Sequence, residues 1–119
     1  MRKILSLKNQ ALIADKCSVA DSFVSRLVGL MGRKGMDSGE ALWFPRCRSI
    51  HMMFMRMSID VVFVRQTGAG LFEVTSLHSG VRPWRLLPLN DWKADDAIEL
   101  PEGCIRRQGL QTGEVLCLS

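Results

Sequence analysis

Short apolar runs, separated by glycine, proline and polar residues, predict a chain built mostly of β-strands. Runs of about four to eight apolar residues between turn-forming residues are typical of strands, and neighbouring strands pair as hairpins. The pattern places strands at residues 4–7, 11–14, 41–44, about 50–55, 59–65, 71–77, 97–100 and 115–118. Residues 66–70 form the turn of the clearest predicted hairpin.

The same pattern predicts one amphipathic helix and one shorter helical turn. Apolar residues recur at the i, i+4, i+7 and i+8 spacing of a helix face, at Phe23, Leu27, Leu30 and Met31. Ser18 or Asp21 can cap the first N–H groups of this helix, and Gly32 is a natural left-handed stop. Residues 102–108 allow a second helical turn that ends at Gly109.

Many short strands with one or two short helices predict a mainly β domain of the α+β kind. We expect a small, partly open barrel or a curled, antiparallel-rich sheet. The end of the chain favours the barrel, because Gly109, Gly113 and Glu114 precede the last strand and the carboxylate can accept backbone N–H groups in the turn. With 119 residues, the chain is predicted to form a single domain, residues 1–119.

Composition and cysteine spacing exclude several classes of protein. No apolar run approaches the roughly 20 residues that span a bilayer, and the first residues lack the pattern of a signal peptide. We therefore expect a cytoplasmic protein without a membrane partner. The four cysteines are widely spaced without a CxxC pair, so the sequence supports neither a zinc site nor another cofactor. Cys47, between Arg46 and Arg48, is the one thiol whose neighbours would lower its pKa.

Positive charge is concentrated in the middle of the chain. Residues 26–85 carry nine basic residues against four acidic ones, and eight of the nine are arginine. Arginine is suited to bidentate binding of carboxylate or phosphate. Because the segment lacks a basic helix, interleaved aromatic residues or a nucleic-acid reading motif, we favour an acidic small molecule or peptide over nucleic acid as the partner.

One methionine-rich and mostly apolar run, residues 51–64, carries three ionisable residues: His51, Arg56 and Asp60. A buried Asp60 must be paired or hydrogen-bonded, because an isolated carboxylate in apolar surroundings is costly. Arg26, Arg33 and Arg56 are its candidate partners. Two interpretations stay open. Either an Arg–Asp pair locks the helix to the sheet, or Asp60 orients the guanidinium of an arginine-lined pocket with His51 at its mouth.

The methionines of this run raise the possibility of a metal site. On an extended strand, His51, Met53, Met55 and Met57 would share one face, and soft thioether ligands suit Cu(I). However, residues on one face of a strand lie about 7 Å apart along it, which is too far for joint coordination. We therefore interpret the methionines as core and expect no metal.

Five blocks of the sequence resemble successive motifs of the "domain of unknown function 192" (DUF192) family. The blocks are RLVGLMGRKG (26–35), ALWF (41–44), HMMFMRMSIDVVFV (51–64), IELPEG (98–103) and GLQTGEVL (109–116). The resemblance runs from about residue 9 to the C-terminus. The matching positions are Arg26, Gly29, Leu30, Met31, Arg33, His51, Phe54, Met55, Arg56, Asp60, Glu99, Gly103, Gly109, Gly113 and Glu114. Family members often have tryptophan at Phe54, proline at Ser58 and aspartate at Glu114.

The resemblance implies a small β-rich domain of bacteria and archaea without an established activity to transfer. Three hypotheses therefore remain. The first, which we favour, is a non-catalytic binding module whose ligand contacts Arg26, Arg33, His51, Arg56 and Asp60. The second is an enzyme that uses His51 and Asp60, with Cys47 as a possible nucleophile. The third is a nucleic-acid-associated barrel that uses the arginine-rich middle of the chain.

Overall fold

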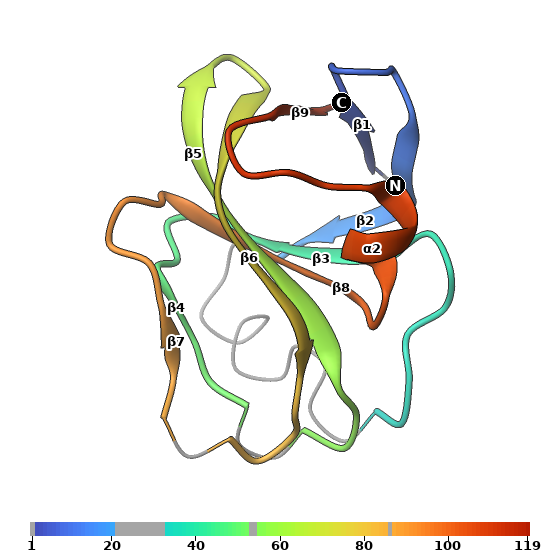
Figure 1. Cartoon of the computed structure of the whole chain (residues 1–119), viewed down its shortest axis with the longest axis vertical. Coiled ribbons are helices and arrows are strands. Elements are labelled where there is room, and N and C mark those ends of the chain that lie inside the picture. The colour runs from blue at the N-terminus through green and yellow to red at the C-terminus, as the bar shows by residue number, and fades with distance from the viewer. Residues whose placement is uncertain (1, 21–32, 53–54, 86) are drawn as a thin grey trace.

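A closed β-barrel is the main body of the protein, whose computed structural model describes residues 2–20, 33–52, 55–85 and 87–119. Neighbouring strands follow the order β1 (Arg2–Ser6), β2 (Leu12–Val19), β3 (Glu40–Phe44), β8 (Asp96–Pro101), β5 (Ile59–Gly68), β6 (Leu71–Val81) and β9 (Val115–Leu118). Pairing of β9 with β1 closes the barrel (Figure 1). The predicted mainly β fold is confirmed, and the barrel is closed where a partly open one was expected.

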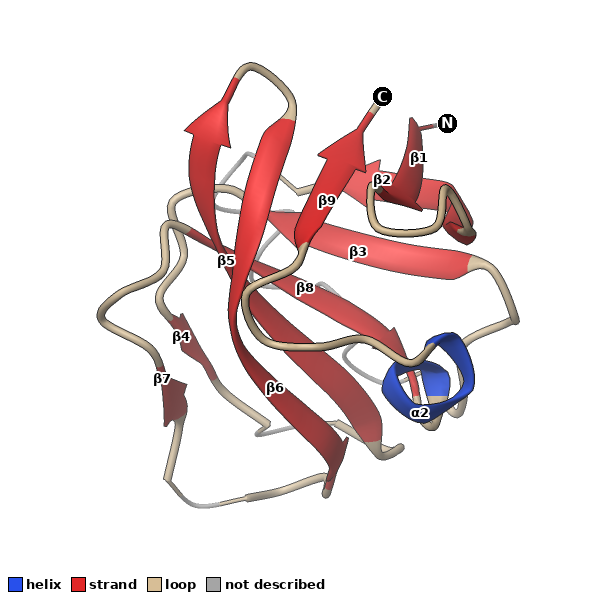
Figure 2. Ribbon diagram, turned by 45° about the horizontal axis from the view of Figure 1, so that its top comes forward, coloured by secondary structure: helices blue, strands red, loops and turns tan. Residues whose placement is uncertain are grey.

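Two smaller elements complete the described fold. β4 (Ser49–Ile50) and β7 (Leu89–Asn90) form a separate two-stranded sheet, which Figure 2 shows beside the barrel. Helix α2 (Cys104–Gln108) follows β8, and its buried Cys104 and Ile105 join the core of the barrel. The helix ends at Gly109, as predicted, with that glycine in the left-handed conformation.

The strands have a buried cluster of side chains on each face. The interior cluster takes residues from all seven barrel strands, including Val62 and Val64 of β5. The intervening residues, such as Val61 and Phe63, point outward into a second cluster. Because both faces are covered, the first six residues of β5 are all buried. This explains why β5 reads as a continuous apolar run rather than as an alternating one.

The methionine-rich run departs from its predicted strand. β4 stops at Ile50, and the N–H of Met55 donates to the carbonyl of Met52 at 3.2 Å, so these two residues are not part of one extended strand. The predicted common face is therefore wrong, because His51 is exposed while Met55 and Met57 are buried; Met53 lies outside the described residues. The prediction of core methionines is confirmed for Met52, Met55 and Met57, all buried in the outer cluster.

Other local predictions have mixed outcomes. Ser18 lies within β2, so it does not cap a helix. Asp96, which directly precedes the predicted strand 97–100, belongs to β8; it is buried and accepts a hydrogen bond from the Trp43 indole at 2.7 Å. The remaining predictions for the amphipathic helix, including those for Gly29 and Met31, lie outside the described residues.

The turn before β9 is built as the sequence predicted. Glu114 accepts the backbone N–H of Gln111 at 2.6 Å and the hydroxyl of Ser6 at 2.7 Å. Gly113 has φ of 91°, which favours glycine. Because Ser6 belongs to β1, this one carboxylate holds the turn and also ties it to the strand with which β9 closes the barrel.

Candidate functional site

Asp60 is buried at the start of β5, on the face that points into the barrel. It pairs in register with Leu100 of β8, a member of the interior cluster. Its exposure is 0%, and both carboxylate oxygens accept backbone N–H groups: Oδ1 from Gly80 at 2.8 Å and Oδ2 from Ile105 at 2.9 Å. The prediction that a buried Asp60 is hydrogen-bonded is therefore confirmed.

The predicted pairing of the Asp60 carboxylate with Arg33 or Arg56 is wrong. Its donors are two backbone N–H groups that form no hydrogen bond within a helix or between strands. Ile105 lies in the first turn of α2, where N–H groups have no partner within the helix. Gly80 sits near the end of β6 at a bend with φ of 59°. One carboxylate thus joins β5 to β6 and to α2.

The other residues of the predicted site do not gather around this carboxylate. Arg33 is exposed and pairs with Glu40, its Nη2 lying 2.9 Å from Oε1. His51 and Arg56 are exposed, and within the described residues neither forms a hydrogen bond or an ion pair. Arg26 lies outside the described residues. The sequence therefore identified a structural aspartate correctly but did not locate its neighbours.

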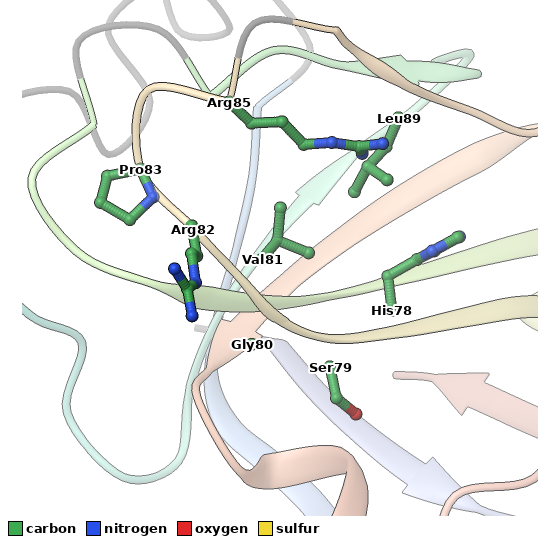
Figure 3. Close-up of a pocket in the computed structure, with 8 residues that line it drawn as sticks. All are labelled: His78, Ser79, Gly80, Val81, Arg82, Pro83, Arg85 and Leu89. Carbon is green, nitrogen blue, oxygen red and sulfur yellow. The ribbon is translucent and has the colours of Figure 1, made fainter.

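A groove lies beside the end of β6 and the segment that follows it (Figure 3). It has a volume of about 710 Å³ and is lined by His78, Ser79, Gly80, Val81, Arg82, Pro83, Arg85 and Leu89. None of these lining residues is acidic, whereas two are arginines. The groove therefore carries positive charge with no internal counter-ion among its described lining.

Arg82 and Arg85 reach the groove from the segment between β6 and β7. This segment is anchored by the N–H of Trp84, which donates to the carbonyl of Met52 at 2.9 Å. Trp84 has φ of 60°, a conformation that costs energy for an L-residue and must be held by its surroundings. In the view of Figure 3, the side chain of Arg85 extends toward Leu89. The two arginines are thus presented by an anchored backbone.

His78 ends a chain of hydrogen bonds that starts at Asp91. The Nε2 of His78 lies 3.2 Å from the Oγ of Ser76, and this oxygen lies 2.6 Å from the Oδ2 of Asp91. Asp91 also accepts the Thr75 hydroxyl at 2.7 Å and the Lys93 N–H at 2.9 Å. Burial raises the pKa of Asp91, but these hydrogen bonds outweigh burial and lower it overall. The carboxylate is therefore charged at neutral pH.

Gly80 connects buried Asp60 to the groove, since it lines the groove and donates its N–H to Asp60. A Cβ at this position would lie 3.1 Å from the Oε2 of Glu102, and the positive φ would strain any other residue. Asp60 accordingly holds the backbone of the groove wall.

Glu99 is a second buried carboxyl group, on the outer face of the sheet. It pairs in register with Leu42 of β3 and Val61 of β5, and Val61 pairs in turn with His78 of β6. Its Oε2 has no hydrogen-bond partner among the described residues. Burial raises the pKa of Glu99 to about 8, so the group is largely protonated at neutral pH. The sequence motif marked this position without indicating its protonation.

Two buried thiols, those of Cys17 and Cys104, have little nucleophilic character. Burial raises the pKa of Cys17 to about 11, and burial also raises the pKa of Cys104. Cys47 is half-buried, and its Sγ donates to the carbonyl of Ser49 at 3.1 Å. Among the described residues, no three His, Cys, Asp or Glu side chains are grouped to hold a metal ion.

A comparison with models of protein families identifies the family of this chain. The model of DUF192, described as "Uncharacterized ACR, COG1430", matches residues 5–118. The chain belongs to the DUF192 family. This confirms the resemblance inferred from the sequence blocks, and DUF192 brings no established activity. No curated protein matches the chain.

Two solved structures share the fold of this DUF192 domain. One is a protein from Sinorhizobium meliloti 1021 described as a "putative transcription regulator", with 19% identity, a TM-score of 0.79, and coverage of 97% of this chain and 89% of that one. The other is a protein of unknown function from Novosphingobium aromaticivorans DSM 12444, with 18% identity, a TM-score of 0.79, and coverage of 97% and 81%. At such identities the likeness establishes the fold alone. In the described part of the chain, no helix is long and apolar enough to cross a membrane.

Proposed function

We propose that this DUF192 domain is a non-catalytic module that binds a small acidic molecule in the groove beside β6. The supporting observation is that His78, Arg82 and Arg85 line one hollow whose described lining includes no acidic residue. Guanidinium groups bind carboxylates and phosphates through paired hydrogen bonds. A volume of about 710 Å³ also suits a small molecule, because such sites span roughly 300–1,000 Å³.

Binding is favoured over catalysis by the state of the candidate reactive groups. Asp60 is enclosed and its two oxygens are occupied by backbone donors, so it does not act with exposed His51 on one substrate. Ser76 directs its single hydroxyl proton to a charged carboxylate, which leaves it unactivated as a nucleophile. These observations weigh against the hypothesis of an enzyme built on His51 and Asp60.

The residues predicted from the sequence as ligand contacts have different roles in this proposal. Asp60 supports the groove wall through Gly80. His51, Arg56 and Arg33 stay candidates for contacts outside the groove lining, and alanine variants of each in the same binding assay test them.

The proposal is tested by calorimetric titration of sulfate and citrate into the protein at low ionic strength near neutral pH. We expect wild-type protein to bind both anions. The double variant Arg82→Ser, Arg85→Ser should weaken binding at least tenfold, because it removes both charge-assisted donors. Arg106→Ser is the matched control, since Arg106 is an exposed arginine on α2 outside the groove lining.

Two results would overturn the proposal. One is the absence of sulfate and citrate binding by the wild-type protein. The other is an equal loss in the Arg106→Ser variant, which would mean that anions respond to overall charge alone. A short oligonucleotide serves as a third titrant. Binding that is tight, falls steeply with salt and does not compete with citrate would replace the proposed ligand by nucleic acid.

A further inference from the structure

His78 is the one group of the described groove lining whose charge can change between about pH 5 and pH 8. Its ring is held on both sides. The Phe63 ring packs edge-on against it with centroids 5.6 Å apart, and Ser76 holds its Nε2 at 3.2 Å. The imidazole therefore has a defined orientation, and Arg85 is close enough to oppose its protonation.

The hydrogen-bond chain also defines which ring nitrogen carries the first proton. Asp91 is charged and can only accept, so the hydroxyl of Ser76 donates to it. The oxygen of Ser76 then accepts the Nε2–H of His78. A second proton on the imidazole must consequently go to Nδ1, which has no hydrogen-bond partner within the described residues.

The charged and titratable groups near His78 come from three segments of the chain. Asp91, after β7, attracts a proton to the ring, whereas Arg85, between β6 and β7, opposes one. Glu99 of β8 shares this face of the sheet, with Val61 between it and His78. The nearest residues of β5, Val61 and Phe63, are apolar. Burial is the largest influence and lowers the pKa of His78 below its ordinary value of 6.5, with Arg85 adding to this and Asp91 opposing it.

An anion in the groove would reverse this balance. A carboxylate, phosphate or sulfate next to Nδ1 supplies a negative charge and an acceptor, both of which favour the imidazolium form. Arg85 would then be neutralised by the same anion and would no longer oppose protonation.

We propose that an acidic ligand binds this groove with the uptake of one proton at Nδ1 of His78, whose ring is positioned by Ser76 and Asp91. The inference rests on the function proposed above and adds to it a ligand-contacting residue, two positioning residues and a pH dependence. The sign follows from linkage: affinity for the anion rises as the pH falls from the pKa of His78 in the complex, which the anion raises, to its lower pKa in the free protein, which lies below 6.5.

Sulfate is the probe for the test, because its charge is constant over the relevant pH range. Its binding is titrated at about pH 5 and about pH 7.5, in buffers of different ionisation enthalpy that count the protons taken up. We expect wild-type protein to bind sulfate about tenfold more tightly at the lower pH, as one added charge-assisted hydrogen bond predicts. His78→Asn should keep most of the affinity at the higher pH and lose the pH dependence.

The protein contains two histidines, so matched variants of His51 and His78 show which of them takes up the proton. The proposal requires that His51→Asn retains proton uptake on binding while His78→Asn abolishes it. Nitrogen chemical shifts of the imidazoles give an independent readout, with free His78 protonated at Nε2. Ser76→Ala removes the acceptor of that proton and should shift the midpoint of the pH dependence without abolishing sulfate binding.

The outcomes separate this inference from the proposed function. Equal sulfate binding by the wild-type protein at both pH values, or loss of proton uptake in the His51→Asn variant, would overturn the role of His78. Neither result would contradict anion binding by the arginines of the groove. Wild-type protein that binds sulfate at neither pH would overturn both. Circular dichroism checks each variant for folding, and His78→Gln replaces His78→Asn if the latter does not fold.

Discussion

Two buried carboxyl groups, Asp60 and Glu99, lie in adjacent strands of the barrel wall and are accommodated in opposite ways. Asp60 pairs with Leu100 and Glu99 pairs with Val61, so their side chains leave neighbouring positions on opposite faces. Asp60 receives two backbone N–H groups in the interior. Glu99, on the outer face, has an oxygen without any partner in the described part of the chain.

The difference lies in the supply of donors rather than in the depth of burial. Strand N–H groups are used in the hydrogen bonds between strands, so the face of a sheet offers a side chain none. At the start of β5, the bend at Gly80 and the first turn of α2 leave two N–H groups free for one carboxylate. A buried carboxyl group can find backbone donors for both oxygens where the backbone is irregular, and it lacks them where the backbone is regular.

The largest expected effect is that of Asp60→Ala. The substitution leaves the N–H groups of Gly80 and Ile105 without acceptors, and each orphaned donor costs roughly 1–3 kcal/mol. We expect the free energy of unfolding to fall by about 2–6 kcal/mol, measured by urea denaturation near neutral pH. Asp60→Asn, which keeps one acceptor, should lose less. A change below about 1 kcal/mol in Asp60→Ala would contradict the role assigned to this carboxylate.

The second effect is a pH dependence caused by Glu99. Its pKa is about 8 in the folded protein against an ordinary 4.5, so between these values the folded state binds the extra proton. Stability should therefore fall as the pH rises through this window, by at most about 1.4 kcal/mol per pH unit. Glu99→Gln removes the titrating group and should flatten the profile. Parallel profiles for wild type and variant, in urea denaturation from about pH 5 to pH 8, would mean that Glu99 is not buried as a neutral acid.

The smallest expected effect is that of Glu114, a third carboxylate, which we compare with Asp60 and Glu99. Its side chain is nearly buried but has donors on both oxygens, from Ser6 and Gln111. Glu114→Gln keeps one acceptor and loses the charge, so we expect unfolding to become easier by about 1 kcal/mol. The control is Lys8→Met, because Lys8 lies 3.8 Å from Glu114 and is largely exposed. A surface ion pair of this kind should contribute only about 0–1 kcal/mol. Equal losses in the two variants would assign the effect to the ion pair.

Much of the fold could be predicted because most of its strands are short apolar runs bounded by turn residues. β3, β5 and β8 were placed within a few residues because each contains a largely buried segment between turn residues. The predicted strand at about 50–55 is wrong beyond Ile50, where β4 ends, because apolar composition does not distinguish a buried irregular segment from a buried strand. Barrel closure depends on pairing across the whole chain, which local patterns do not report.

The site could be predicted only in part, for reasons that differ between residues. Asp60 stood out because a charge in an apolar run needs a partner, but its partners are backbone N–H groups, which leave no mark in a sequence. Arg82 and Arg85 were not predicted as site residues, because the nearby Pro83 and Pro88 are compatible with any edge strand or extended loop and indicate no site. The signal that the sequence offered was the short distance along the chain from His78 to these two arginines.

Closure of the barrel by β1 and β9 has a consequence for the order of folding. Residues 2–6 and 115–118 must pair across almost the full length of the chain before the interior cluster is sealed. Contacts of such sequence separation carry a large loop-closure cost and slow folding. On the ribosome, the β5–β6 hairpin can form while β1 still awaits its last partner, so the barrel is completed only after synthesis has passed β9.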